Sequence, residues 1–297
     1  MTGGNPITDG GGRGDGFAPP AALLPFAREA AGLFLYDAGL SQAGNGPPLL
    51  LLHGNGDEAD SWRRVLPGLS RHSRVVAPDL PGFGRSAPQG AGGLEALSGA
   101  VVRLLEELDL GGVRLVGSSL GAAVAVLVAL AAPGRVAGLV LVGGGLPHQF
   151  GAGASPLLAP GVGEAFYNGL REQGQEAAYA TLRGFYADLG GLPAEERAFL
   201  RERVWARVWS DRQRDAFLAA LRSLGAAEPL DPARLAGMPL RLIWGERDAV
   251  VPLRVAHELR SALPQARLSV IPGAGHLPQQ ERPDEFLEAL LGEVGRT

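Results

Sequence analysis

Two adjacent serines, Ser118 and Ser119, lie between glycines in the stretch VRLVGSSLGAAVAVLVALA, residues 113–131. The residues before the serines favour a buried strand, and the Ala-rich residues after them favour a buried helix. Only a tight turn joins the two, and Gly117 and Gly121 supply the small residues that such a turn needs. This stretch therefore requires a strand followed at once by a helix, with one serine at the turn.

The residues from Gly117 to Gly121 match the pattern G-x-S-x-G, whose middle serine is a nucleophile on a strand-to-helix turn. Ser119 is the candidate nucleophile, and we interpret Ser118 as a small residue tolerated in a crowded turn. The first N–H groups of the following helix favour negative charge at this point. Because the pattern is short and the chain has 45 glycines, the assignment needs a base and an acid at matching positions.

The rest of the chain alternates short apolar runs with helix-like segments, which predicts an α/β fold with a mainly parallel sheet flanked by helices. A strand-poor, helix-like segment interrupts the alternation, and we expect an inserted helical cap at residues 146–236. The core then comprises residues 23–145 and 237–297, and the Gly/Pro/Asp-rich residues 1–22 are expected to form a flexible tail. The expected strands are residues 33–39, 48–54, 73–82, 113–117, 138–144, 240–245 and 266–273.

Composition excludes several kinds of site and partner. The 297 residues include no cysteine, which excludes thiolate metal sites. The formal net charge of −4 predicts no surface for nucleic acid. The longest apolar run, residues 120–133, is shorter than the roughly 20 residues of a membrane span. The first residues lack the basic start and apolar core of a signal peptide. We expect a cytoplasmic protein that binds a small-molecule substrate and neither nucleic acid nor membrane.

A histidine and an aspartate follow the last two expected strands. His276 lies in IPGAGHLP, and Asp248 lies in WGERDAVVP, with Glu246 as a competing acid two residues earlier. Loops at the carboxyl ends of parallel strands meet at one edge of the sheet. Both side chains are therefore expected near Ser119.

Four separated motifs resemble those of the α/β-hydrolase fold family. HGNG at residues 53–56 resembles its oxyanion loop and DLPGFGRS at 79–86 its turn after the next strand, while GERD at 245–248 resembles its acid loop and GAGH at 273–276 its histidine loop. The similarity covers nearly the whole chain from about residue 30. It implies a hydrolase of that fold.

The resemblance also implies roles for individual residues. Ser119, Asp248 and His276 follow the family's chain order of nucleophile, acid and histidine. Neutral His276 would take the Ser119 proton and return it to the leaving group, with Asp248 orienting the imidazole. The backbone N–H groups of Asn55 and Leu120 correspond to the oxyanion hole. We expect no metal ion and no cofactor.

Other polar residues near these motifs have competing interpretations. His53 is expected to hydrogen-bond loop backbone, and Asp79 and Ser86 to hold the turn that contains them. Asp57 is interpreted as a helix cap, with a place at the mouth of the site as the alternative. An asparagine at position 55 resembles haloalkane dehalogenases, but these enzymes, like the family's epoxide hydrolases, use an aspartate nucleophile. Because Ser119 occupies the position of the nucleophile at the strand-to-helix turn, both chemistries are disfavoured.

Most of the aromatic side chains fall in the expected cap, which predicts an apolar acyl or alcohol pocket. Arg183 and Arg207 are candidates for binding a substrate carboxylate, with an exposed helix face as an equal alternative. The candidate substrate-binding residues are His148, Phe150, Phe166, Tyr186 and Trp205.

The sequence therefore predicts a capped serine hydrolase, a carboxylesterase acting on a small or medium apolar ester. A hydrolase of carbon–carbon bonds in meta-cleavage products and an enol-lactonase resemble the same layout, and both would want a cationic or polar carboxylate site in the cap. An acyltransferase or perhydrolase differs only in what attacks the acyl-enzyme. A non-catalytic ligand receptor is the alternative from another class of protein.

Overall fold

The computed structural model describes residues 17–39, 46–150 and 155–292, except for the side chain of Phe150. The strands form one sheet in the order β1-β2-β4-β3-β5-β6-β7-β8. β1 and β2 form an antiparallel hairpin, β2 is antiparallel to β4, and the remaining neighbours are parallel. The strands are β1 (Ala27–Ala30), β2 (Leu33–Ala38), β3 (Leu49–Leu52), β4 (Val75–Pro78), β5 (Val113–Ser118), β6 (Val136–Val142), β7 (Leu240–Gly245) and β8 (Arg267–Ile271).

This topology confirms the predicted fold class, a mainly parallel α/β sheet. One strand was missed: β1 has the sequence AREA, which is short and half polar and so lacks an apolar run. Its backbone pairs with β2 across a tight turn, in which Ala31 and Gly32 both have positive φ. Pairing with a neighbouring strand, and not the residue pattern, defines this element.

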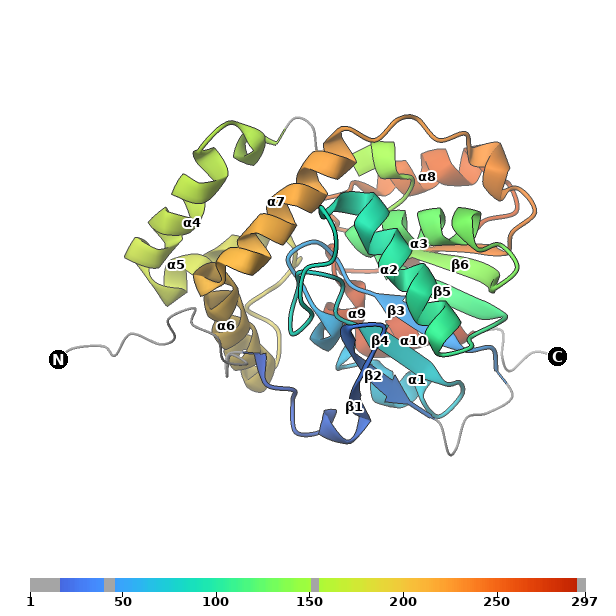
Figure 1. Cartoon of the computed structure of the whole chain (residues 1–297), viewed down its shortest axis with the longest axis horizontal. Coiled ribbons are helices and arrows are strands. Elements are labelled where there is room, and N and C mark those ends of the chain that lie inside the picture. The colour runs from blue at the N-terminus through green and yellow to red at the C-terminus, as the bar shows by residue number, and fades with distance from the viewer. Residues whose placement is uncertain (1–16, 40–45, 151–154, 293–297) are drawn as a thin grey trace.

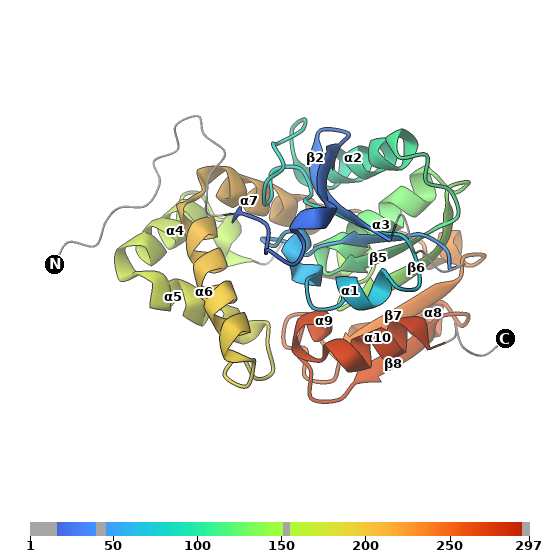
Figure 2. The same cartoon turned by 90° about the horizontal axis from the view of Figure 1, so that it is seen from below.

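Helices cover both faces of the sheet (Figures 1 and 2). On one face, α2 (Gly93–Glu107), α3 (Leu120–Ala131) and α8 (Leu253–Ala262) pack into the larger apolar core. On the other face, α1 (Leu66–Leu69) and α10 (Pro283–Leu291) form a second core. The central strands are buried on both sides, which explains their continuous apolar runs.

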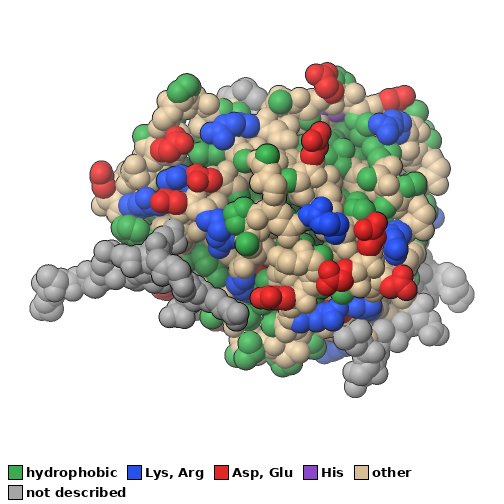
Figure 3. Space-filling model, viewed as in Figure 1, with side chains coloured by type: hydrophobic (Ala, Val, Ile, Leu, Met, Phe, Trp, Pro, Cys, Tyr) green, Lys and Arg blue, Asp and Glu red, His purple; other side chains and the backbone are tan. Residues whose placement is uncertain are grey.

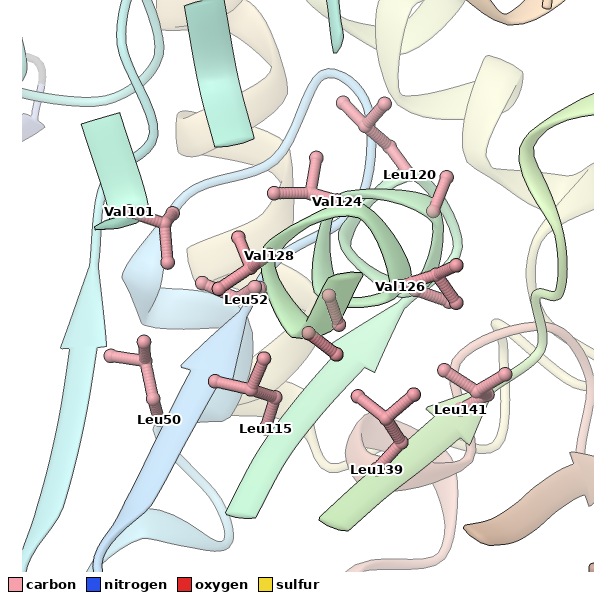
Figure 4. Packing of buried hydrophobic residues seen from close by; sticks show 14 of the residues in the cluster. Leu50, Leu52, Val101, Leu115, Leu120, Val124, Val126, Val128, Leu139 and Leu141 are labelled. Atoms are coloured by element: carbon pink, nitrogen blue, oxygen red, sulfur yellow. The ribbon is translucent and has the colours of Figure 1, made fainter. Parts of the chain in front are cut away.

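The helix after Ser119, α3, is apolar on nearly all sides because it lies between the sheet and α2. A Cβ at Gly121 would lie 2.2 Å from the Leu52 carbonyl oxygen, so only glycine permits the first turn of α3 to approach β3 this closely. Figure 4 shows the packing of α3 over the strands. Labelled there are Leu120, Val124, Val126 and Val128 of α3, Val101 of α2, Leu50 and Leu52 of β3, Leu115 of β5, and Leu139 and Leu141 of β6.

Between β6 and β7 the described residues contain helices and no strand. They include α4 (Val162–Gln173), α5 (Gln175–Ala180), α6 (Ala194–Trp209) and α7 (Asp211–Gly225). In Figure 1 α4, α5 and α6 lie to one side of the sheet, and α7 runs from them toward α2. We refer to residues 146–236, the predicted insertion, as the cap.

Part of the predicted N-terminal tail packs against the cap. Phe17 is buried beneath the Arg203 guanidinium, and the Ala18 carbonyl accepts a hydrogen bond of 3.1 Å from Arg203. Packed structure therefore begins by residue 17, earlier than the predicted boundary at residue 22. Residues 1–16 of that tail lie outside the described residues.

Charged side chains are mixed on the face of the molecule that Figure 3 draws. On the face drawn in Figure 3, arginine and acidic side chains are interspersed and form no large area of one sign. Within the described part of the chain, no helix has the length and apolarity needed to cross a membrane.

Candidate active site

Ser119 occupies the sharp turn between β5 and α3. Its φ of 52° lies in the left-handed region, which residues with a side chain rarely adopt. The turn is held because the Ser119 N–H donates to Val142 O at 2.9 Å and the Ser119 carbonyl accepts from Ala122 N at 2.8 Å. A Cβ at Gly144 would lie 3.0 Å from the Ser119 Cα, so this neighbour must also be small.

The loop after β3 lies directly beside this serine. A Cβ built on Gly54 would be 3.4 Å from the Ser119 Cβ, which places Asn55 next to the turn. Leu120 is the first residue of α3, and the first N–H groups of a helix have no intrahelical acceptor. Unused backbone donors therefore lie close to the Ser119 side chain.

His53 holds the same loop, as expected. Its Nε2 accepts from the Leu80 N–H at 2.9 Å, so the proton is on Nδ1, which donates to Gly54 O at 2.8 Å. Burial lowers the pKa of His53 and favours this neutral form. Both ring nitrogens of His53 therefore hydrogen-bond backbone.

Asp248 and His276 form a buried pair. His276 Nδ1 and Asp248 Oδ2 are 2.9 Å apart, and Asp248 Oδ1 accepts from the N–H groups of Val250 and Val251, both at 2.9 Å. The carboxylate holds the proton on Nδ1, which leaves Nε2 with a lone pair. That Nε2 atom is buried and has no hydrogen-bond partner within the described structure. Glu246, the competing acid, accepts instead from the Gly273 N–H at 2.9 Å.

A glycine at the end of β6 makes room for this pair. Gly143 has a φ of 52°, and a Cβ there would lie 3.2 Å from both Asp248 Oδ2 and His276 Nδ1. The sequence analysis missed this residue, although the run of three glycines after β6 was a visible signal.

The cap holds the histidine loop from its other side. The His276 N–H donates to Phe185 O at 2.8 Å, and the two rings are 5.9 Å apart. Glu281, in α9 (Pro278–Glu281), accepts from the N–H groups of Gly275 and Asp188. The position of the imidazole therefore depends on both the core and the cap.

A cavity of about 270 Å³ lies between the cap and this edge of the sheet. The core contributes Ser119, His276 and Asn55 to its wall. The cap contributes mainly apolar side chains: Leu157, Phe166, Tyr167, Leu170, Leu182, Phe185, Tyr186, Leu200, Val204, Val208 and Phe217.

Two of the predicted substrate-binding residues, Phe166 and Tyr186, line this cavity. Trp205 and His148 are not among the described residues of its wall. Trp205 packs edge-on against Trp209, with ring centroids 5.7 Å apart, and His148 accepts from the Leu230 N–H at 3.2 Å.

The side chain of the fifth predicted residue, Phe150, lies outside the described residues.

Helix geometry explains why Trp205 does not line the cavity. Leu200, Val204 and Val208 of α6 are spaced four residues apart, so they share one helix face, and that face lines the cavity.

Arg207 of the cap also reaches the cavity, where core carboxylates bind it. Its Nη2 lies 2.7 Å from Asp57 Oδ1 and 2.8 Å from Glu58 Oε1, and its Nε lies 3.0 Å from Glu58 Oε2. Burial alone would raise the pKa of Glu58, but Arg207 and Arg203 outweigh it and lower the pKa to about 2. The expected helix cap at Asp57 is wrong: the 3₁₀ helix begins at Ala59, whose N–H donates to Asp79.

The charged cluster continues deeper between cap and core. Arg203 contacts Glu58 and Asp60, and Asp60 also binds Arg85. Burial raises the pKa of Asp60, although both arginines favour its charged form. The sequence analysis missed this cluster, although an acidic run after the oxyanion loop and two arginines four residues apart on α6 were both readable.

Comparison with known proteins agrees with the fold. Residues 47–283 match the family described as alpha/beta hydrolase fold. The chain therefore belongs to the α/β-hydrolase fold family, as its motifs predicted.

Characterised relatives in this family act on different substrates. The chain is 32% identical over 83% of its length to an acetyltransferase component of the acetoin cleaving system from Pseudomonas putida, of which it spans 63%. It is 31% identical over 85% of its length to a pimeloyl-[acyl-carrier protein] methyl ester esterase from Vibrio vulnificus, of which it spans 96%.

Solved hydrolase structures also resemble this chain, and one of them serves as an example. A 2-hydroxy-6-oxo-6-phenylhexa-2,4-dienoate hydrolase from Rhodococcus sp. superposes with a TM-score of 0.70 and 26% sequence identity. The alignment covers 88% of this chain and 94% of that one. The chain is therefore similar to hydrolases that differ in their named substrates.

Proposed function

We propose that the chain is a serine hydrolase that cleaves a neutral, apolar carboxylic ester of small or medium size. The main support is the Asp248–His276 pair, whose unpartnered Nε2 belongs to a residue in the same cavity wall as Ser119. A neutral imidazole oriented by a carboxylate is the base that a serine nucleophile requires. The apolar cap side of the cavity suits the hydrocarbon parts of such an ester.

In the first step, Ser119 Oγ attacks the ester carbonyl carbon while its proton passes to His276 Nε2. Asp248 stabilises the resulting imidazolium through the 2.9 Å contact to Nδ1. The carbonyl oxygen becomes an oxyanion that accepts from the N–H groups of Leu120 and Asn55. The bond to the alcohol oxygen then breaks, His276 protonates the leaving alcohol, and the acyl group remains on Ser119.

Water completes the reaction by the reverse sequence. His276 takes a proton from the water as its oxygen attacks the acyl carbon, and the same backbone donors hold the second oxyanion. Collapse of this intermediate returns the proton to Ser119 Oγ and releases the carboxylic acid. One ester and one water give one acid and one alcohol, and the side chains are restored.

The cavity favours an ester over a substrate that carries a carboxylate. A 2-hydroxy-6-oxo-dienoate, the substrate in the name of the Rhodococcus relative, is such an anion. Arg207 is the one cationic side chain among the described residues of the cavity wall. Because Asp57 and Glu58 already bind Arg207, its positive charge is balanced, and a substrate carboxylate would add a third negative charge beside it.

The test compares wild type with Ser119→Ala on p-nitrophenyl esters of increasing acyl length. We expect a burst of p-nitrophenolate, an optimum chain length that reflects the cavity, and a loss of about 10⁴-fold or more in the variant. Ser118→Ala is the matched control, because Ser118 is fully buried, bonds Gln279 and lies outside the described cavity wall. Absence of turnover on every ester, or turnover that survives Ser119→Ala, would overturn the proposal; a 2-hydroxy-6-oxo-dienoate assayed in parallel tests the alternative.

A further inference from the structure

A buried amide side chain of the cap lies in the cavity wall and has no part in the proposed ester hydrolysis. Gln213, in α7, is 3% exposed and lines the cavity. Its Oε1 accepts from the Gly84 N–H at 3.2 Å, whereas its Nε2 is buried without a partner among the described residues. Rotating the amide by half a turn would set two donors against each other at Gly84. The contact to Gly84 therefore keeps the NH₂ group as the unused end.

Asn55 has the complementary arrangement. Its Nδ2 donates to Phe217 O at 3.2 Å, and its Oδ1 is buried with no partner in the described structure. The opposite amide orientation would place two oxygens together, so the free group here is an acceptor. Phe217 follows Gln213 by four residues, so about one turn of α7 positions both amides. Besides His276 Nε2, the described cavity wall thus contains one buried donor, Gln213 Nε2, and one buried acceptor, Asn55 Oδ1, without a partner.

A buried polar group without a partner destabilises a protein, and native structures retain few of them. Two such groups with opposite hydrogen-bonding roles in one cavity wall indicate a ligand that satisfies both. We propose that Gln213 and Asn55 form a subsite for a hydroxyl group on the acyl or alcohol part of the substrate, an inference that rests on the proposed ester hydrolysis. The hydroxyl oxygen accepts from Gln213 Nε2, and its proton is donated to Asn55 Oδ1.

The same groups disfavour other substituents. A methylene leaves both amide ends unpaired, so the unsubstituted ester gains no contact there. A carboxylate has no proton to donate, so it leaves Asn55 Oδ1 unpaired. It would also be repelled by Asp57 and Glu58, which follow Asn55 by two and three residues in the same loop. The subsite therefore selects a neutral group that both accepts and donates.

The test uses pairs of p-nitrophenyl esters of equal chain length, with and without a hydroxyl at successive carbons. For wild type we expect kcat/KM to favour the hydroxylated ester about tenfold at one position, the effect of a hydrogen bond of ordinary strength. Gln213→Leu should bring that ratio to about one.

Gln175→Leu is the matched control in the cap. Gln175 also bonds backbone and a side chain, donating to Arg201 O and Glu202 Oε1, and it is not among the described residues of the cavity wall. Its ratio should equal that of wild type. No preference at any carbon in wild type, or an unchanged ratio in Gln213→Leu, would overturn the subsite.

Binding separates this inference from the proposed function. Methyl ketones with and without the hydroxyl resemble the esters but have no leaving group, and calorimetry gives their Kd without turnover. If wild type hydrolyses no ester, the proposed function fails while the Kd ratio still reports the subsite. Tighter binding of the hydroxy ketone in wild type and not in Gln213→Leu supports it, and equal Kd values overturn it.

Discussion

The core edge and the cap enclose the same cavity, yet they hold their residues in different ways. Backbone geometry positions the core residues: Ser119 sits at a positive φ, and Asp248 accepts two N–H groups of its own loop. Side chains position the cap, since Arg203 and Arg207 bind core carboxylates across the boundary. The residues of the proposed chemistry thus lie on strand-end loops, whereas the cap, which shapes much of the cavity, is attached by ion pairs and apolar contacts.

The core half of this comparison is tested by the two acids of one loop. Asp248→Asn should lower kcat/KM for an ester by about 10⁴-fold, because the amide no longer stabilises the imidazolium or holds the correct tautomer. Glu246→Gln should have little effect, since in the described structure the Glu246 carboxylate accepts from the Gly273 N–H, whereas Asp248 contacts His276. Steady-state kinetics of both variants decides the assignment, and a large loss in the Glu246 variant alone would transfer the role to that residue.

The cap half is tested by two arginines that the sequence left equivalent. Arg207→Leu should destabilise the protein by about 3–5 kcal/mol, because Glu58 keeps a buried charge with one partner fewer. Arg183 is exposed and does not line the cavity described here. Arg183→Leu should therefore change stability by less than about 0.5 kcal/mol.

Urea unfolding of the two variants, followed by circular dichroism, measures this difference. If the Arg207 variant is as stable as the Arg183 variant, side-chain ion pairs do not attach the cap and the contrast between the two regions fails.

Low pH also tests how ion pairs attach the cap, because the pKa of Glu58 is lowered from 4.5 to about 2. A carboxyl with a depressed folded-state pKa contributes stability above its unfolded pKa and loses it as pH falls through the folded value. The change corresponds to about 3 kcal/mol, which is present at pH 5 and lost progressively between pH 4.5 and 2. Asp60 opposes part of this loss, since its pKa is raised and its protonation favours the folded state.

Glu58→Gln isolates the contribution of this group. Wild type should exceed the variant in free energy of unfolding at pH 5, and the two should converge as the pH approaches 2. Urea titrations at several pH values measure both curves. A difference that stays constant across this range would show that Glu58 ionisation does not support the folded state.

The same contrast explains how far the sequence predicted the molecule. The sheet, Ser119 and the Asp248–His276 contact followed from local signals, since strands, turns and strand-end loops are read from neighbouring residues. The position of Trp205 and the partners of Arg207 did not, because they depend on how α6 is rotated against segments some 150 residues away in the chain. Gln213 carried no pattern at all, and only its unpartnered amide in the structure drew attention to it.

The smallest predicted effect concerns Phe166 and Trp205, two aromatic residues of the cap that were both predicted to bind substrate. Phe166 lines the cavity, whereas Trp205 packs against Trp209 and against a small apolar cluster of the cap. Phe166→Ala should enlarge the cavity and move the preferred p-nitrophenyl ester toward longer acyl chains, by roughly tenfold in the kcat/KM ratio of long to short esters. Trp205→Ala should lower stability and leave that ratio unchanged, since it removes packing behind the wall. Acyl-length profiles of both variants, measured together with their unfolding curves, separate the two roles. An equal change of profile in both variants would contradict the prediction. It would mean that the whole cap shapes the cavity, and not only the residues that line it.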